Sequence, residues 1–165
     1  MKYKFIVLFL FLHIISFSQS KKNIRKYGIK VQIENVQEGK NTYKSEQSVY
    51  DSNGNEIEWI KYNKDGSIKK KRISKYDKKN NLIEEQEFDG NQLTRKVTYA
   101  YNNFDEKISE ITYDGNGQVL RKEIFTYNNK GLKSEKKVYD KNDNLISTHT
   151  YQYYTSKNNS ADKNE

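Results

Sequence analysis

The chain has 165 residues, a formal net charge of +8, and neither cysteine nor proline. Without cysteine, disulfides, thiolate nucleophiles, cysteine-based metal sites and a lipoprotein anchor are excluded. Only 33% of the residues are hydrophobic, and this share includes 14 tyrosines, which β-strands accommodate well. The composition therefore favours a thin core built largely on tyrosine.

Residues 1–18 are predicted to form a secretory signal peptide. Lys2 and Lys4 supply a short basic region, and the apolar run that begins at Phe5 is shorter than the roughly 20 residues of a membrane span. Small residues precede Gln19, where we expect cleavage. The mature protein is then secreted or periplasmic, without a stable membrane anchor. An uncleaved anchor is the alternative.

Residues 19–26 form a basic lead-in, and a sheet is expected to begin near Tyr27. Ile29, Val31 and Ile33 alternate with polar residues ahead of a turn at Glu38-Gly39, and the chain returns over residues 43–50. This alternation is typical of a β-hairpin.

From Tyr50 onward an aromatic residue recurs just before each turn. Every second step, from Tyr50 to Tyr76, Tyr101, Tyr127 and Tyr153, spans 26, 25, 26 and 26 residues. The full series is Tyr50, Tyr62, Tyr76, Phe88, Tyr101, Tyr113, Tyr127, Tyr139 and Tyr153. A fixed period of this length indicates a tandem repeat, here a hairpin of about 26 residues.

The spacing within each half-repeat has a backbone cause. Asp or Asn follows most of the aromatics and is suited to open a turn, because its side chain accepts backbone N–H groups. Four residues after the aromatic stands a type that tolerates the left-handed conformation, namely Gly54, Gly66, Asn80, Asp105, Gly117, Gly131 and Asp143. The Phe88 unit deviates, and its Asp89-Gly90 pair predicts a two-residue turn.

Between turns the residues alternate with period two, as Leu93, Val97 and Tyr101 show on one face. Short connections make neighbouring strands antiparallel, so residues 27–154 are predicted to form one all-β domain, an elongated meander sheet of tandem hairpins with no helices. Residues 155–165 are polar and without periodicity, which is typical of a disordered tail.

The turns carry a resemblance. The segments Tyr50-Asp51-Ser52-Asn53-Gly54 and Tyr113-Asp114-Gly115-Asn116-Gly117, with their counterparts at Tyr76 and Tyr139, look like the Tyr-Asp repeats of RHS-type proteins. In that family, long arrays of such hairpins form a strip that spirals into a shell, often around a toxic domain. The resemblance implies stacked hairpins outside the cytoplasm. With about four double units here, we expect no shell. The Tyr-x-x-x-Gly spacing also resembles MORN-type repeats, which are binding scaffolds.

No catalytic, metal or cofactor site is predicted. Lysines are scattered among glutamates along every segment, as on solvated strands, so nucleic acid is not an expected partner. After cleavage His149 is the remaining histidine, and no partner for acid–base chemistry is evident. Turn propensity accounts for the turn aspartates, whose surroundings lack the glycine and glutamate of a calcium-binding loop. We therefore expect a protein that is not an enzyme.

Four aromatic residues are the candidate ligand contacts. Tyr99, Phe125 and Tyr151 each lie two residues before a repeat tyrosine, where Ser48 and Ser74 stand in the earlier repeats. Such a stripe could stack on sugar rings or receive a partner's apolar side chains, and it could equally be the better-packed half of the core. Trp59 is a separate, weaker candidate.

The sequence leaves three functions open. The first is an exported binding module for an envelope glycan or protein. The second is a structural repeat that self-associates through unpaired strand edges. The third is a short relative of the RHS shell proteins.

Overall fold

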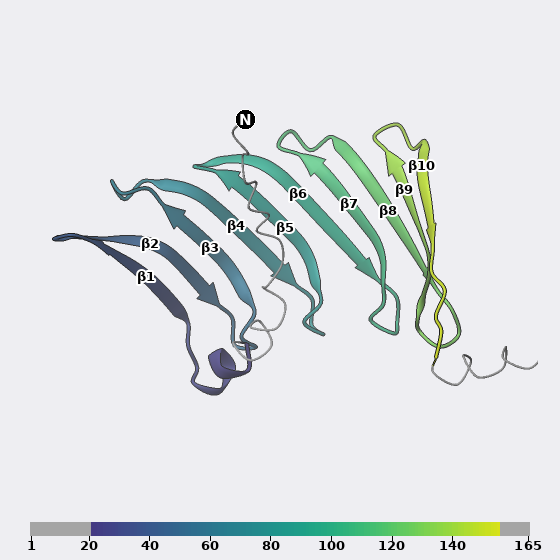
Figure 1. Ribbon diagram of the computed structural model, residues 1–165, viewed down its shortest axis with the longest axis horizontal. Coiled ribbons are helices and arrows are strands. Elements are labelled where there is room, and N and C mark those ends of the chain that lie inside the picture. The colour runs from purple at the N-terminus through teal and green to yellow at the C-terminus, as the bar shows by residue number, and fades with distance from the viewer. Residues whose placement is uncertain (1–20, 156–165) are drawn as a thin grey trace, which may run out of the picture.

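The computed structural model describes residues 21–155 and shows one open sheet of ten antiparallel strands (Figure 1). The strands follow one another in chain order across the sheet, which confirms the predicted all-β meander. The predicted signal peptide and most of the predicted disordered tail lie outside the described residues. The strands are β1 (Val31–Glu38), β2 (Asn41–Tyr50), β3 (Glu56–Tyr62), β4 (Ile68–Tyr76), β5 (Leu82–Asp89), β6 (Gln92–Tyr101), β7 (Lys107–Asp114), β8 (Val119–Tyr127), β9 (Lys133–Asp140) and β10 (Leu145–Thr150).

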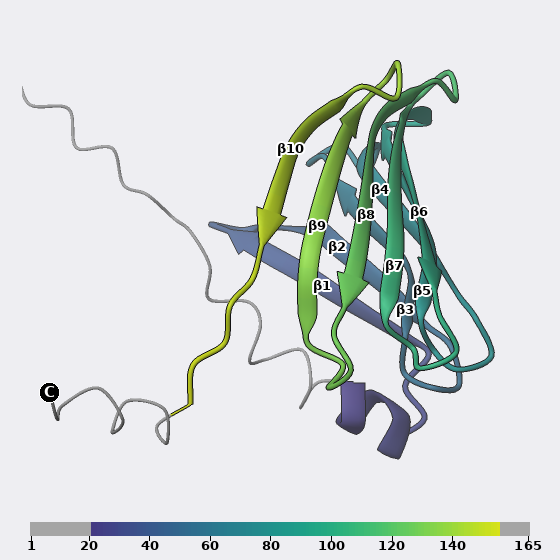
Figure 2. The same cartoon turned by 90° about the vertical axis from the view of Figure 1, so that its right-hand side faces the viewer.

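The sheet is a single twisted and curved layer (Figure 2). Over residues 21–155 each strand contacts its sequence neighbours, and no second layer covers either face. No helix in this part of the chain is long and apolar enough to cross a membrane.

A short helix precedes the sheet, so the expectation of a chain without helices is wrong for residues 21–26. The helix lies at the turn between β2 and β3, and its Ile24 is buried (Figure 1). A Cβ atom on Gly54 would lie 2.7 Å from the carbonyl oxygen of Lys21, so glycine permits this contact. Tertiary docking of this kind leaves no periodicity in the sequence. The sheet was expected to begin near Tyr27, but the helix occupies residues 21–26 and the first strand begins at Val31.

Seven of the turns share one backbone conformation. At each, the residue four places after the aromatic has a φ between 60° and 85°, which confirms all seven predicted left-handed positions. In the turn after Tyr50, the Asp51 N–H donates to the Asn55 carbonyl and the Gly54 N–H donates to the Asp51 carbonyl, and the other six turns repeat this pair. The β5–β6 connection is a two-residue turn, as predicted, but its residues are Gly90 and Asn91, between paired Asp89 and Gln92, rather than Asp89 and Gly90.

The Asp or Asn that opens the turn also caps it. Its Oδ1 accepts the N–H groups two and four residues later, as Asp77 does from Lys79 at 2.8 Å and Asn81 at 2.9 Å. The same pattern occurs at Asp51, Asn102, Asp114, Asn128 and Asp140. This confirms that turn chemistry is a sufficient reason for these residues.

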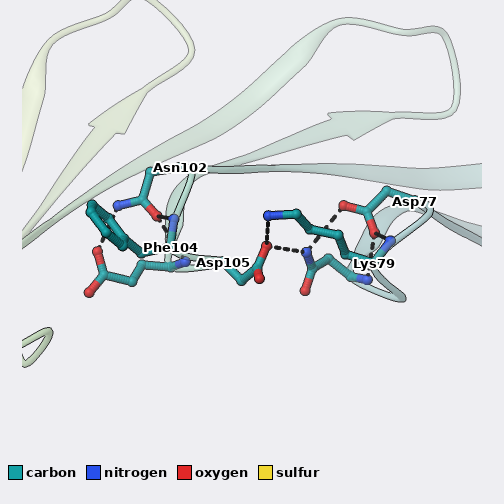
Figure 3. Close-up of polar contacts among 7 residues, drawn as sticks. Asp77, Lys79, Asn102, Phe104 and Asp105 are labelled. Atoms are coloured by element: carbon teal, nitrogen blue, oxygen red, sulfur yellow. Dashed lines mark hydrogen bonds and ion pairs between the residues drawn. The ribbon is translucent and has the colours of Figure 1, made fainter.

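Consecutive turns at one end of the strands also bond to each other. Asp105 accepts from the Nζ of Lys79 at 2.9 Å and from the Nδ2 of Asn81 at 3.2 Å (Figure 3). Asn55 makes the equivalent bond to Asn80 at 3.1 Å. These contacts fix the distance between successive hairpins at this end of the sheet.

The repeat tyrosines link each hairpin to the one before it. The hydroxyl of Tyr101 donates to the Leu82 carbonyl at 2.9 Å, and that of Tyr127 donates to the Lys107 carbonyl at 2.8 Å. Tyr76 and Tyr153 bond to the carbonyls of Glu56 and Lys133 in the same way. Because each bond reaches back about 20 residues to the same point of the preceding repeat, the period of the sequence is also the period of these contacts.

Cross-strand partners divide the side chains between two faces. The Trp59 face carries Trp59, Arg72, Ser74, Glu85, Val97, Tyr99, Glu123, Phe125 and Val138. The Phe88 face carries Ile60 and three directly paired lysine–aromatic couples, Lys71–Phe88, Lys96–Tyr113 and Lys122–Tyr139, with ammonium-to-ring distances of 4.4, 4.5 and 5.2 Å. Most buried apolar side chains of the strands, namely Val97, Phe125 and Val138, lie on the Trp59 face.

Candidate functional site

The predicted stripe exists, and lysines alternate with its aromatic rings. The Lys107 ammonium lies 5.2 Å from the centre of the Tyr99 ring and 5.0 Å from that of Phe125. Lys133 lies 4.6 Å from Phe125 and 5.6 Å from Tyr151. The structure therefore brings Tyr99, Phe125 and Tyr151 together in one row that crosses the C-terminal half of the Trp59 face.

The three rings differ in how far a ligand could reach them. Phe125 is only 5% exposed and has a lysine on each side, so it acts chiefly as core. Tyr99 is half-buried, and burial, with smaller contributions from Glu85 and Glu110, raises its pKa to about 12. Tyr151 is 38% exposed directly after β10 and is the accessible ring of the row.

Trp59 lies apart from this stripe, on β3. The guanidinium of Arg72, the cross-strand partner of Trp59, lies 5.6 Å from the centre of the indole ring. The indole Nε1 of Trp59 donates a hydrogen bond to Glu46 at 3.1 Å. Stacking with Arg72 connects Trp59 to a second feature of the same face, which the sequence did not predict.

This second feature is a groove of about 480 Å³ between β2 and β5, which we call the Arg72 groove. Its walls include Asn55, Glu56, Arg72, Ser74, Tyr76 and Glu85. Ser74 and Ser48 occupy the repeat positions that Tyr99, Phe125 and Tyr151 occupy further along the chain. Small side chains at these positions leave open the space that rings fill in the C-terminal half.

Charges in the groove are arranged in a chain of contacts. Arg72 binds Glu56 at 2.6 Å and lies 3.9 Å from Glu85, and Ser48 donates to the other oxygen of Glu56 at 2.9 Å. Burial raises the pKa of Glu85, although Arg72 opposes this effect. Burial, the largest single influence, disfavours the charge of Arg72, but the hydrogen bond to Glu56 and the nearby negative charges of Glu56 and Glu85 together outweigh it and raise the Arg72 pKa. The groove thus holds an arginine between two carboxylates of unequal environment.

Asn55 has an unpaired polar atom at this groove. The residue is 2% exposed, and its Nδ2 donates to Asp51 at 2.8 Å and to Asn80 at 3.1 Å. Its Oδ1 is buried and accepts no hydrogen bond within the part of the chain that the structure describes. Leaving a buried acceptor unsatisfied costs about 1–3 kcal/mol.

His149 was predicted to be a strand residue without a catalytic role, and its Nε2 lies 3.2 Å from the Ser147 Oγ. Alternation places residues two apart on one face of a strand, so this pair could have been found in the sequence. Both residues are on the last strand, and no carboxylate of the described residues hydrogen-bonds the imidazole. In residues 21–155 no three histidine or carboxylate side chains gather as metal ligands.

No family model and no curated protein matches this chain. Among solved structures, it is similar to TarM of S. aureus in complex with fondaparinux, alpha-GlcNAc-glycerol and UDP (20% identity, TM-score 0.32), over 78% of this chain and 23% of TarM. A porin-like protein from Bacteroides uniformis gives 15% identity and a TM-score of 0.39, over 74% of this chain and 50% of that protein. A protein of unknown function from Bacteroides fragilis gives 14% identity and a TM-score of 0.24, over 76% of this chain and 95% of that protein. At these TM-scores the similarities establish neither a family nor an activity.

Proposed function

We propose that this chain is an exported, non-enzymatic binding module that presents its Trp59 face to a glycan or protein of the cell envelope. The observation that carries the proposal is the Arg72 groove, where an arginine lies between two carboxylates. Open grooves with a few convergent polar groups are typical of binding sites.

Two further features support this proposal. Residues 1–18 have the pattern of a secretory signal, which favours a partner outside the cytoplasm. The hairpins also resemble the Tyr-Asp repeats of RHS-type proteins, and in the described chain the repeated contacts are turn caps and tyrosine hydroxyl bonds rather than paired reactive groups. A repeat scaffold of this kind supports recognition without chemistry.

The test is retention of host envelope fractions, polysaccharide and protein separately, on the immobilised protein. One variant replaces Tyr99, Phe125 and Tyr151 by alanine, a second replaces Ser74 by phenylalanine, and a control replaces Phe88, Tyr113 and Tyr139 by alanine on the opposite face. We expect saturable, salt-resistant retention that the control keeps and at least one Trp59-face variant loses. Retention of nothing by the wild-type protein would overturn the proposal.

Self-association is the second candidate function, and the two edge strands favour it. β1 and β10 each pair on one side only, and both expose apolar side chains, Val31 and Ile33 on β1 and Leu145 and Ile146 on β10. Unpaired edges of this kind are templates for pairing with another chain. Size-exclusion chromatography over a hundredfold range of concentration tests this candidate. A monomer throughout that range contradicts it.

A further inference from the structure

We infer that the Arg72 groove binds one neutral hexopyranose unit of a glycan, an inference that rests on the proposed binding function. Glu56, Arg72, Ser74 and Glu85 supply the polar contacts, with the rings of Tyr50 and Tyr76 beside them. The groove is specific to one repeat, its polar atoms match hydroxyl groups, and its balanced charges disfavour ions.

The polar set occurs once in the repeat series. One repeat later, Leu82, Val97 and Tyr99 replace Glu56, Arg72 and Ser74. Two repeats later the same places hold Lys107, Glu123 and Phe125. Since the turns and the tyrosine contacts are common to all repeats, fold alone does not require the groove residues to be polar.

The polar atoms of the groove suit adjacent hydroxyl groups. The carboxylates of Glu56 and Glu85 accept hydrogen bonds, whereas Arg72 donates them and Ser74 can do either. A hydroxyl both donates and accepts, so a sugar can satisfy this mixed set. The volume of about 480 Å³ lies within the range of small-molecule sites.

Charge excludes the main alternatives. The charged residues that line the groove are Arg72, Lys21, Glu56 and Glu85, so its formal charges cancel. An anionic ligand would have to approach two carboxylates, and a divalent cation would lie against the guanidinium that already binds Glu56. A neutral, hydroxyl-rich ligand meets neither repulsion.

Trp59 provides the readout, because it is the only tryptophan of the chain and its ring stacks with Arg72. The purified protein is titrated with the methyl glycosides of glucose, galactose, mannose and N-acetylglucosamine, followed by tryptophan fluorescence and by calorimetry. We expect saturable binding of at least one glycoside with a dissociation constant on the order of 1 mM, as suits a ligand of this size.

Two variants and a control locate the binding. Ser74→Phe copies Phe125 and should fill the groove, so we expect at least a tenfold loss of affinity. Glu85→Gln keeps the shape but replaces an acceptor oxygen by a donor, and we expect at least a threefold loss even if Ser74→Phe fails to fold. Ser109→Phe adds the same ring to the Phe88 face, where Ser109 pairs with Ala100, and should leave the affinity unchanged.

The outcomes separate this inference from the proposed function. If no glycoside binds by either readout, or if Glu85→Gln binds as the wild type does, the inference is overturned. If the immobilised protein still retained an envelope fraction, the proposed binding function would hold, but with a different ligand or a different surface. Tighter binding of glucuronate than of any neutral glycoside would also overturn the neutral class.

Discussion

The two halves of the sheet share a backbone but differ in what they do with the Trp59 face. In β2–β5, the small side chain of Ser74 lines an open groove with charged walls. In β6–β9, Tyr99 and Phe125 fill the equivalent positions and pack between lysines. Both halves keep the same capped turns and the same tyrosine contacts. The repeated residues therefore specify the backbone. The size of the side chain two places before the repeat tyrosine determines whether that part of the face is filled by a ring or left open as a groove.

The largest expected effect comes from removing the packing that distinguishes the C-terminal half. Phe125→Ala should lower the free energy of unfolding by about 3–5 kcal/mol, because the ring is buried between Lys107 and Lys133. Ser74→Ala, at the equivalent position of the earlier repeat, removes only a hydroxyl and should change stability by about 1 kcal/mol or less. Urea denaturation measures the free energy of unfolding of both variants. Equal losses would contradict the difference in packing between the two halves.

Turn capping should matter equally in both halves. Asp77→Ala removes the acceptor of two backbone N–H groups and should cost about 1–2 kcal/mol. Asp77→Asn should cost much less, since Asn102 and Asn128 cap their own turns through the same atom. If Asp77→Ala and Asp77→Asn lose the same amount in urea denaturation, the negative charge rather than the capping bond is what stabilises this turn.

The tyrosine contacts separate the first repeat from the later ones. Tyr127→Phe deletes a bond to a backbone carbonyl and should cost about 1 kcal/mol. The hydroxyl of Tyr50 has no earlier hairpin to reach and bonds to the exposed side chain of Gln32 at 3.2 Å, so Tyr50→Phe should cost less. Thermal unfolding of both variants shows which one loses more stability. A larger loss for Tyr50→Phe than for Tyr127→Phe contradicts this account of the tyrosine contacts.

The smallest expected effect is the pH dependence of the groove. Burial raises the pKa of Glu85 in the folded state, so the stability that this group contributes is present below its unfolded pKa and is lost as pH rises through the folded pKa. Glu85→Gln does not titrate. Relative to the wild type, its stability should therefore be greater near pH 7 than near pH 4, by about 1 kcal/mol or less. The opposite trend in urea denaturation would show that the Arg72 ion pair dominates.

The sequence predicted the scaffold better than the site. Period-two alternation and the aromatic series predicted the meander, and the residue types at Gly54, Asn80 and Asp105 predicted left-handed turn positions, because both signals are local. The helix over residues 21–26 was missed because it depends on docking against Gly54, a contact distant in sequence.

The candidate site shows the same division. Alternation placed Tyr99, Phe125 and Tyr151 in one row, but it could not tell that lysines would cover Phe125. The Arg72 groove depends on side chains from different strands, and its one sign in the sequence is the presence of serine at positions that aromatic residues occupy in later repeats. A repeat that lacks an aromatic residue at this position thus indicates a candidate site as clearly as a repeat that has one.

Strand pairing over residues 21–155 joins strands that are adjacent along the chain, and this governs how the protein folds and how its length is set. Strand pairing here closes short loops only, so the usual kinetic penalty of distant β pairing is small. A unit of about 26 residues begins and ends at equivalent points of the hydrogen-bond pattern. Insertion or removal of one such unit leaves every remaining register intact, so gene duplication can lengthen the sheet without redesigning it, while a single unit is free to acquire its own groove.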